Sequence, residues 1–234
     1  GLLFATIGLL PTTFIILILY IISSFLMLFL PKAEVEVLES ETNLEVLLKG
    51  WKLVARDPRL RLFVSANLFE IFSNTIWVSS IILVFVTELL NKTESYWGYS
   101  NTAYSIGIII SGLIAFRLSE KFLALKWESI LFSLIAMAIV TLTILFFPNA
   151  QMFLVFSALV GMLSQLKEVP ESVFLQETVE ENNLVNVYSV LEVISTLAFS
   201  VFVLLMSYIT ESFGISISFC LSAICLMIEA ILIY

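Results

Sequence analysis

The sequence predicts an all-α membrane protein folded as a helical bundle, and three observations carry this prediction. Of the 234 residues, 60 % are hydrophobic and only 13 % are charged, whereas a soluble domain is nearer half apolar and a quarter charged. Seven segments reach or approach the twenty or so apolar residues that a membrane span needs. The positive charges gather between alternate segments. Because lipid satisfies no backbone polar groups, such segments are expected to be helices.

The seven predicted spans are 11–30, 62–87, 99–116, 130–147, 152–173, 185–209 and 213–234. Residues 1–10 are apolar but too short to span, so we expect them to end an earlier helix. Pro11 suits the first turn of the helix that follows. The sequence begins at Gly1 without an initiator methionine, and we therefore expect a fragment of a longer protein.

Lysine and arginine lie on one side of this topology. Six basic residues fall between the first and second spans, three fall between the third and fourth, and Lys167 lies near the end of the fifth. The opposite side carries only Lys92. The positive-inside rule therefore places the first, third and fifth connections in the cytoplasm.

The first connection divides the chain into three regions. Residues 1–30 hold the end of one transmembrane helix and a complete one, 31–61 form a cytoplasmic linker, and 62–234 form a six-helix transmembrane bundle. Within the linker, TNLEVLLKGWKLVARDP predicts a short amphipathic helix, with Thr42 and Glu45 as a capping box and Asp57-Pro58 as its stop. A helix along the inner membrane surface and one packed under the bundle fit this pattern equally.

Polar side chains share one face on two of the spans. Both faces contain a glutamate about eight residues, or roughly 12 Å, from a cytoplasmic end. Carboxylates at matching depth suggest a shared water-filled cavity. The faces comprise Asn67, Glu70, Asn74 and Trp77 on the second span and Ser189, Glu192, Thr196 and Ser200 on the sixth.

Glu70 allows two interpretations. It is either a carboxylate that pairs with a cation near the cytoplasmic end, or a protonatable group on a substrate path. The fifth span adds Gln165 as a path candidate, while Lys167 and Glu171 near its end are expected at the headgroups.

The remaining spans predict packing surfaces. Ala103, Gly107 and Ser111 on the third span form a small-residue face that allows close helix approach. The fourth span has no charge and the seventh has only Glu229 near its end. We expect both to face lipid on most sides.

Several functions are excluded by what the chain lacks. It contains no histidine, which removes histidine metal sites and Ser-His-Asp triads. It also has no GxxxxGK[ST] motif for ATP hydrolysis. Cys220 and Cys225 are five residues apart and point in different directions on a helix, so no disulfide is expected. We expect no metal, no cofactor and no nucleic-acid partner.

Three stretches carry a resemblance to a known family. They are LLKGWKLVARDPRLR, YWGYSNTAYSIGIIISGLIAFRLSEKF and VPESVFLQETVEENNLVNVYSV. Together they resemble the C-terminal half of a major facilitator superfamily transporter, helices six to twelve, in the drug and siderophore exporter branch. The resemblance implies proton-coupled efflux of amphiphilic small molecules across the bilayer, most simply the bacterial cytoplasmic membrane. It further implies that helices seven, eight, ten and eleven line the path, and that an N-terminal half of the same protein is missing.

The match to the superfamily's cytoplasmic loop motif is incomplete. Gly112, Arg117 and Lys121 fit the motif, whereas Phe116 and its neighbours Ser119 and Glu120 do not. In the later connection, Val185 and Asn186 stand where that branch usually has Gly-Arg.

Two other classes of membrane protein are alternatives, one because of the number of spans and one because of the carboxylates within them. A seven-span receptor or scaffold fits the number of spans, but the third span has no DRY-like end and the seventh has no NPxxY. An intramembrane enzyme would need paired carboxylates within reach, for which Glu70 and Glu192 are the candidates. No motif supports chemistry on a substrate, so we expect a transporter and not an enzyme.

Overall fold

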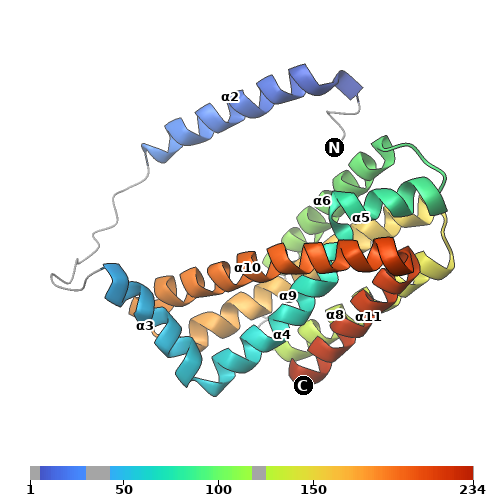
Figure 1. Ribbon diagram of the computed structural model, residues 1–234. Helices are drawn as coiled ribbons and strands as arrows, with labels where there is room; N and C mark the ends of the chain where they lie inside the picture. Colours follow the sequence, from blue (N-terminus) through green and yellow to red (C-terminus); the bar gives the residue numbers. More distant parts are fainter. Residues whose placement is uncertain (1–5, 30–42, 118–124, 234) are drawn as a thin grey trace.

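The computed structural model describes residues 6–29, 43–117 and 125–233 (Figure 1). Helix is the regular structure throughout this part of the chain, which confirms the all-α prediction. The α-helices are α2 (Leu9–Met27), α3 (Asn43–Arg56), α4 (Pro58–Asn74), α5 (Ser79–Val84), α6 (Ser95–Arg117), α8 (Lys126–Phe146), α9 (Ala150–Thr178), α10 (Glu181–Phe213) and α11 (Ile215–Ile233). Six of them are long and apolar enough to cross a membrane, or seven spans if the bent pair α4–α5 counts as one.

The N-terminal helix α2 lies apart from the bundle formed by the other helices (Figure 1). Gly8 precedes it with a φ of 81°, a left-handed conformation that glycine adopts without steric cost. No residue of α2 is buried. The short helix α3 instead packs on α10, where the backbone at Gly50 approaches Asn186. The predicted capping residue Thr42 lies outside the described residues.

The helix α4 begins as its sequence dictates. Pro58 takes the first position, where a missing N–H costs nothing, and the Asp57 side chain accepts a hydrogen bond from the Arg59 amide at 2.7 Å. The preceding helix α3 ends at Arg56, directly before the predicted stop at Asp57-Pro58.

The second predicted span is not one straight helix. It passes from α4 through a 3₁₀ turn (Thr75–Trp77) to α5 and a π-helical turn (Phe85–Leu89). Val78 is extended, with φ −65° and ψ 141°, and the two halves of the span meet at 43°. Thr75 supplies a local reason, because its hydroxyl donates to the Phe72 carbonyl at 2.6 Å at the end of α4.

The core lies between α5, α8, α9 and α11. The ring of Phe85 packs between those of Phe153 and Phe219, with centroid distances of 5.5 and 4.9 Å. The prediction that the fourth and seventh spans face lipid on most sides was wrong. About half of each is buried, 50 % for α8 and 44 % for α11, whereas the corresponding share of α10 is 11 %.

The closest helix contact joins α6 and α9. Gly107 of α6 lies on the backbone of Ala158, and Gly161 of α9 lies on the backbone of Tyr104. Ser111 is buried on the same face and Ala103 is half-buried. Small residues at these positions let the two backbones approach so closely that no room remains for a side chain between them.

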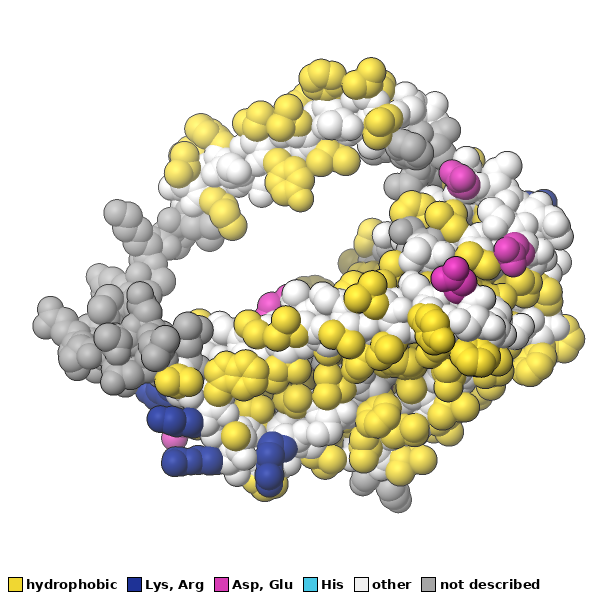
Figure 2. All heavy atoms as spheres, viewed as in Figure 1, with side chains coloured by type: hydrophobic (Ala, Val, Ile, Leu, Met, Phe, Trp, Pro, Cys, Tyr) yellow, Lys and Arg dark blue, Asp and Glu magenta, His cyan; other side chains and the backbone are white. Residues whose placement is uncertain are grey.

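Charge is distributed unevenly along the bundle. In Figure 2, Lys and Arg side chains gather at the end where α3 meets α4, while the middle of the bundle is largely apolar. We call the end where α3 meets α4 the basic end. There α4 and α8 begin and α9 and α11 end, and the positive-inside rule assigns it to the cytoplasm.

Candidate functional site

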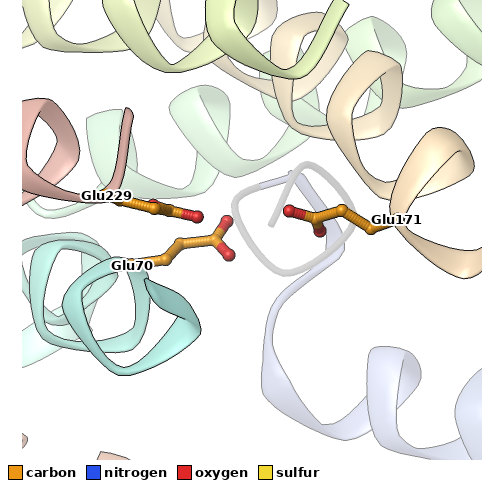
Figure 3. A group of neighbouring side chains, drawn as sticks. All are labelled: Glu70, Glu171 and Glu229. Atoms are coloured by element: carbon orange, nitrogen blue, oxygen red, sulfur yellow. The ribbon is translucent and has the colours of Figure 1, made fainter. Parts of the chain in front are cut away.

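Four charged side chains from three helices meet inside the bundle. The Lys167 ammonium on α9 lies 2.6 Å from the Glu70 carboxylate on α4, 2.8 Å from Glu171 on α9 and 3.5 Å from Glu229 on α11. Figure 3 shows the three carboxylates pointing toward one another from their separate helices. We call these four residues the charge cluster.

The charge cluster is shielded from solvent. The side chains of Lys167 and Glu229 are 2 % and 1 % exposed, and those of Glu70 and Glu171 are 13 % and 11 % exposed. Asn67 donates to the Glu70 carboxylate at 3.3 Å. Neither oxygen of Glu229 has a hydrogen-bond partner in the described part of the chain. A carboxylate so placed depends on the nearby ammonium for its stabilisation.

The carboxylates of the cluster have the spacing of a cation site. One oxygen from each of Glu70, Glu171 and Glu229 lies within 4.8 Å of the others. Lys167 supplies the positive charge at their centre. The Lys167 ammonium therefore occupies the place that a metal ion would take, and we assign no metal to the cluster.

A serine pair extends the same contact between α4 and α11. The hydroxyls of Ser73 and Ser222 share a hydrogen bond of 2.6 Å, and Ser222 also approaches the Ser73 carbonyl at 3.1 Å. Ser73 is three residues from Glu70 and Ser222 is seven from Glu229, so each pair shares one helical face. The polar contacts of the two helices therefore extend over about one turn of α4 and two turns of α11.

A polar pocket of about 250 Å³ lies between α4, α5, α6 and α9. Its aromatic lining residues are Trp77, Trp97 and Tyr104, and its amides are Asn74 and Asn101. Ser100, Ser157 and Ser164 add hydroxyls, and no lining residue carries a charge. Such a surface combines flat apolar area with a few hydrogen-bonding groups, the usual composition of a small-molecule site.

The polar pocket and the charge cluster are neighbours on two helices. On α4, Asn74 of the pocket follows Glu70 of the cluster by four residues, and on α9, Ser164 precedes Lys167 by three. At 1.5 Å per residue the offsets are about 6 and 4.5 Å. A change in position of α4 against α9 at the cluster must therefore also move the pocket walls.

The predicted site residues fall into three groups, with Gln165 apart from them. Asn67 and Glu70 belong to the charge cluster, whereas Asn74 and Trp77 line the polar pocket. Gln165 is half-buried on α9 between the two sites. The third group, Ser189, Glu192 and Thr196, is exposed on α10.

Within the described residues Glu70 and Glu192 do not meet, because Glu192 is exposed on α10 while Glu70 pairs with Lys167 of α9. A cavity shared by the two carboxylates stays a prediction. Of the two interpretations of Glu70, the structure supplies the cation for the first, Lys167.

Three members of the charge cluster were misplaced by sequence reasoning. Lys167 and Glu171 were expected at the headgroups but are buried, because α9 continues to Thr178, five residues beyond the predicted span. Glu229 was treated as a charge near a helix end. A signal existed: Ser218, Ser222 and Glu229 repeat at spacings of four and seven, which places them on one face of α11.

The residues that resemble the loop motif lie at the end of α6. Gly112 is half-buried within that helix, and Arg117 is its last residue and is exposed. Lys121 lies outside the described residues.

These observations define a multi-pass membrane bundle with a polar pocket beside a buried charge cluster. The family model for the Major Facilitator Superfamily matches residues 63–234, and the chain belongs to this superfamily. Membership in this transporter superfamily points to transport and not to enzyme chemistry, as the sequence predicted, and the receptor or scaffold alternative is not favoured.

Two curated relatives come from Bacillus subtilis (strain 168). The chain is 27 % identical over 185 residues to the uncharacterized MFS-type transporter YfmI, which covers 79 % of this chain and 46 % of that protein. It is 28 % identical over 173 residues to the uncharacterized MFS-type transporter YjbB, with coverages of 74 % and 43 %. The chain thus spans less than half the length of these relatives. No solved structure matches it.

Proposed function

We propose that the chain is the C-terminal half of a proton-coupled exporter of amphiphilic small molecules, acting in the bacterial cytoplasmic membrane. The single observation that carries this proposal is the charge cluster next to the polar pocket. The resemblance to drug and siderophore exporters supports the export direction. Helices seven, eight and ten of that resemblance correspond to α4–α5, α6 and α9, the helices that form the pocket.

The composition of the charge cluster suits a proton site. Three carboxylates face one ammonium, so the cluster can hold a proton and still keep an ion pair on Lys167. Ionisable groups inside membrane helices are costly and usually belong to ion or proton pathways. Glu70 is the carboxylate through which we expect coupling, because it lies one turn before the pocket residue Asn74 on α4, and the pocket residue Trp77 follows in the adjoining 3₁₀ turn.

The proton acts through the positions of the helices. With all three carboxylates ionised, Lys167 is attracted to α4, α11 and the neighbouring turn of α9 together. A proton on Glu70 removes the charge on α4 and weakens that attraction. Because the pocket begins one turn away on both α4 and α9, the loosened contact changes the pocket, and a bound substrate in turn changes the affinity for the proton.

The lining of the polar pocket indicates the substrate class. Trp77, Trp97 and Tyr104 offer aromatic faces, whereas Asn74 and Asn101 offer amide donors and acceptors. A molecule with a ring system and a few polar groups matches both. The pocket is smaller than most drug sites, and we infer that an N-terminal half closes it from the other side, as alternating access requires two halves around one site.

A transport assay on the full-length protein tests this proposal. Reconstituted in liposomes with an imposed pH gradient, wild type should drive uphill movement of an amphiphilic dye, and Glu70→Gln should abolish it. The comparison variant is Glu192→Gln, which removes a carboxylate outside the charge cluster, and it should weaken transport less than Glu70→Gln does. Gradient-driven transport at wild-type rate in Glu70→Gln would reduce the cluster to a structural contact between helices.

A further inference from the structure

The basic end of the bundle contains a second cavity, of about 380 Å³, which shares no lining residue with the polar pocket. It lies where α4 and α8 begin and α9 and α11 end. Its charged lining residues are Arg59, Lys126, Glu171 and Glu177. Glu171 already pairs with Lys167, which leaves Arg59, Lys126 and Glu177 for a ligand that itself carries both charges.

One wall of this cavity is aromatic. The Phe174 ring lies 5.3 Å from Trp127 and 5.6 Å from Phe63 between centroids. A neighbouring hollow of about 300 Å³ shares Trp127 and Ile233 with the cavity and is further lined by Glu128 and Leu131 of α8. The two hollows therefore adjoin at Trp127 and Ile233.

The outer face of α8 beyond these hollows is apolar and exposed. Phe132 is 64 % exposed and Ile139 is 59 % exposed. In a membrane-spanning helix such a face contacts acyl chains, because no water is present at that depth. A chain that follows the neighbouring hollow from Trp127 therefore leaves the cavity into lipid.

The ionic groups of the cavity can exchange partners. Lys126 contacts Glu177 across the cavity, but their side chains are 23 % and 56 % exposed, and an ion pair so open to water contributes little stability. Arg59 lines the same cavity without a carboxylate partner in the described residues. A phosphate that reaches Arg59 and Lys126 gains charge-assisted hydrogen bonds to both.

We propose that this cavity binds a phospholipid of the inner leaflet whose headgroup carries both a phosphate and a primary ammonium, as phosphatidylethanolamine does. The phosphate lies between Arg59 and Lys126, the ammonium donates to Glu177, and one acyl chain follows Trp127 onto the outer face of α8. A choline headgroup lacks N–H donors for Glu177. A glycerol headgroup has no positive group to take the place of Lys126 at Glu177. The site thus selects ethanolamine by charge and by hydrogen bonding.

The test is lipid quenching of Trp127 in the full-length protein. It is reconstituted in nanodiscs that contain brominated phosphatidylethanolamine, phosphatidylcholine or phosphatidylglycerol at equal mole fraction. The difference in quenching between wild type and Trp127→Phe isolates the signal of this tryptophan. We expect the relative association of ethanolamine lipid to exceed that of choline lipid about three- to tenfold, the range for one or two charge-assisted hydrogen bonds in a half-exposed site.

A pair of arginines provides the matched control. Arg59→Gln should reduce the ethanolamine preference to near one, whereas Arg61→Gln should leave it unchanged, because Arg61 is exposed on α4 and does not line the cavity. Equal quenching by ethanolamine and choline lipids in wild type would overturn the proposal. So would stronger quenching by the glycerol lipid, which would mean attraction by net positive charge alone.

Discussion

The close contact between α6 and α9 makes a quantitative prediction about Gly107. A Cβ added there would lie 2.8 Å from the Ala158 carbonyl carbon and 2.9 Å from the Met162 amide nitrogen, and closer still to the Ala158 carbonyl oxygen. Ordinary contact begins at 3.4 Å and the Ala158 carbonyl oxygen is the nearest obstruction, so the helices must separate by roughly 1 Å or more. All the obstructing atoms belong to the backbone and cannot rotate away. Gly107→Ala therefore loosens the whole contact between these helices.

The magnitude follows from the dispersion energy of that contact. A gap of 0.5–1 Å forfeits about a quarter to a half of each atom pair's well of roughly 0.1–0.2 kcal/mol. Over the tens of atom pairs along a helix contact, the loss is about 1–3 kcal/mol. Gly112→Ala is the matched control, since it lies on the same helix and its Cβ would meet nothing within 4 Å. Both changes share the same gain in helix propensity, so their difference isolates the steric cost.

Thermal unfolding in detergent measures the difference. A thiol-reactive fluorophore follows the exposure of Cys220 and Cys225, which are half-buried in α11. Gly107→Ala should unfold several degrees below Gly112→Ala. Equal Tm values for the two variants would refute the argument that backbone contact at Gly107 limits the approach of α6 and α9.

Three further predictions concern other parts of the molecule. Gly50→Ala should release α3 from α10, because its Cβ would lie 2.5 Å from the Asn186 carbonyl oxygen. Faster proteolysis within α3 at an unchanged Tm of the bundle checks this prediction, and an unchanged rate of proteolysis contradicts it. Lys167→Met should lower the Tm much more than Glu229→Gln, because it leaves three buried carboxylates without their cation. Breaking a buried ion pair lowers the free energy of unfolding by about 3–5 kcal/mol. Similar Tm values for the two variants would argue against the ammonium as the main stabilising group. In a background without other cysteines, Lys52→Cys should react with an impermeant reagent only from the cytoplasm and Lys92→Cys only from outside, and labelling of both from one side would reject the predicted orientation.

The fold was largely readable from the sequence, because a bilayer permits few alternatives for long apolar segments. The seven predicted spans correspond to α2, the bent pair α4–α5, α6, α8, α9, α10 and α11. The break at Val78 was not predictable. NTIWVSS contains neither proline nor glycine, so no helix-breaking residue marks the position of the break.

The candidate site was predictable only in part. Glu70 stood out because a charge in mid-span is costly wherever it faces. Lys167, Glu171 and Glu229 lie near span ends, where charge is ordinary, and only their convergence from different helices distinguishes them. Convergence depends on how α4, α9 and α11 pack, which helix periodicity alone does not determine. The polar face of α10 is exposed in the bundle, so the role predicted for it on the substrate path stays a prediction.

The most direct test of the central claim, that the charge cluster carries the coupling proton, is substrate-induced proton release from the full-length protein in detergent. A transported amphiphile is added in weak buffer, and the protons released per bound substrate are measured with a pH indicator. The account predicts release from wild type and from Glu192→Gln, and none from Glu70→Gln at equal substrate occupancy. Undiminished release from Glu70→Gln would contradict it and make Glu70 a structural partner of Lys167.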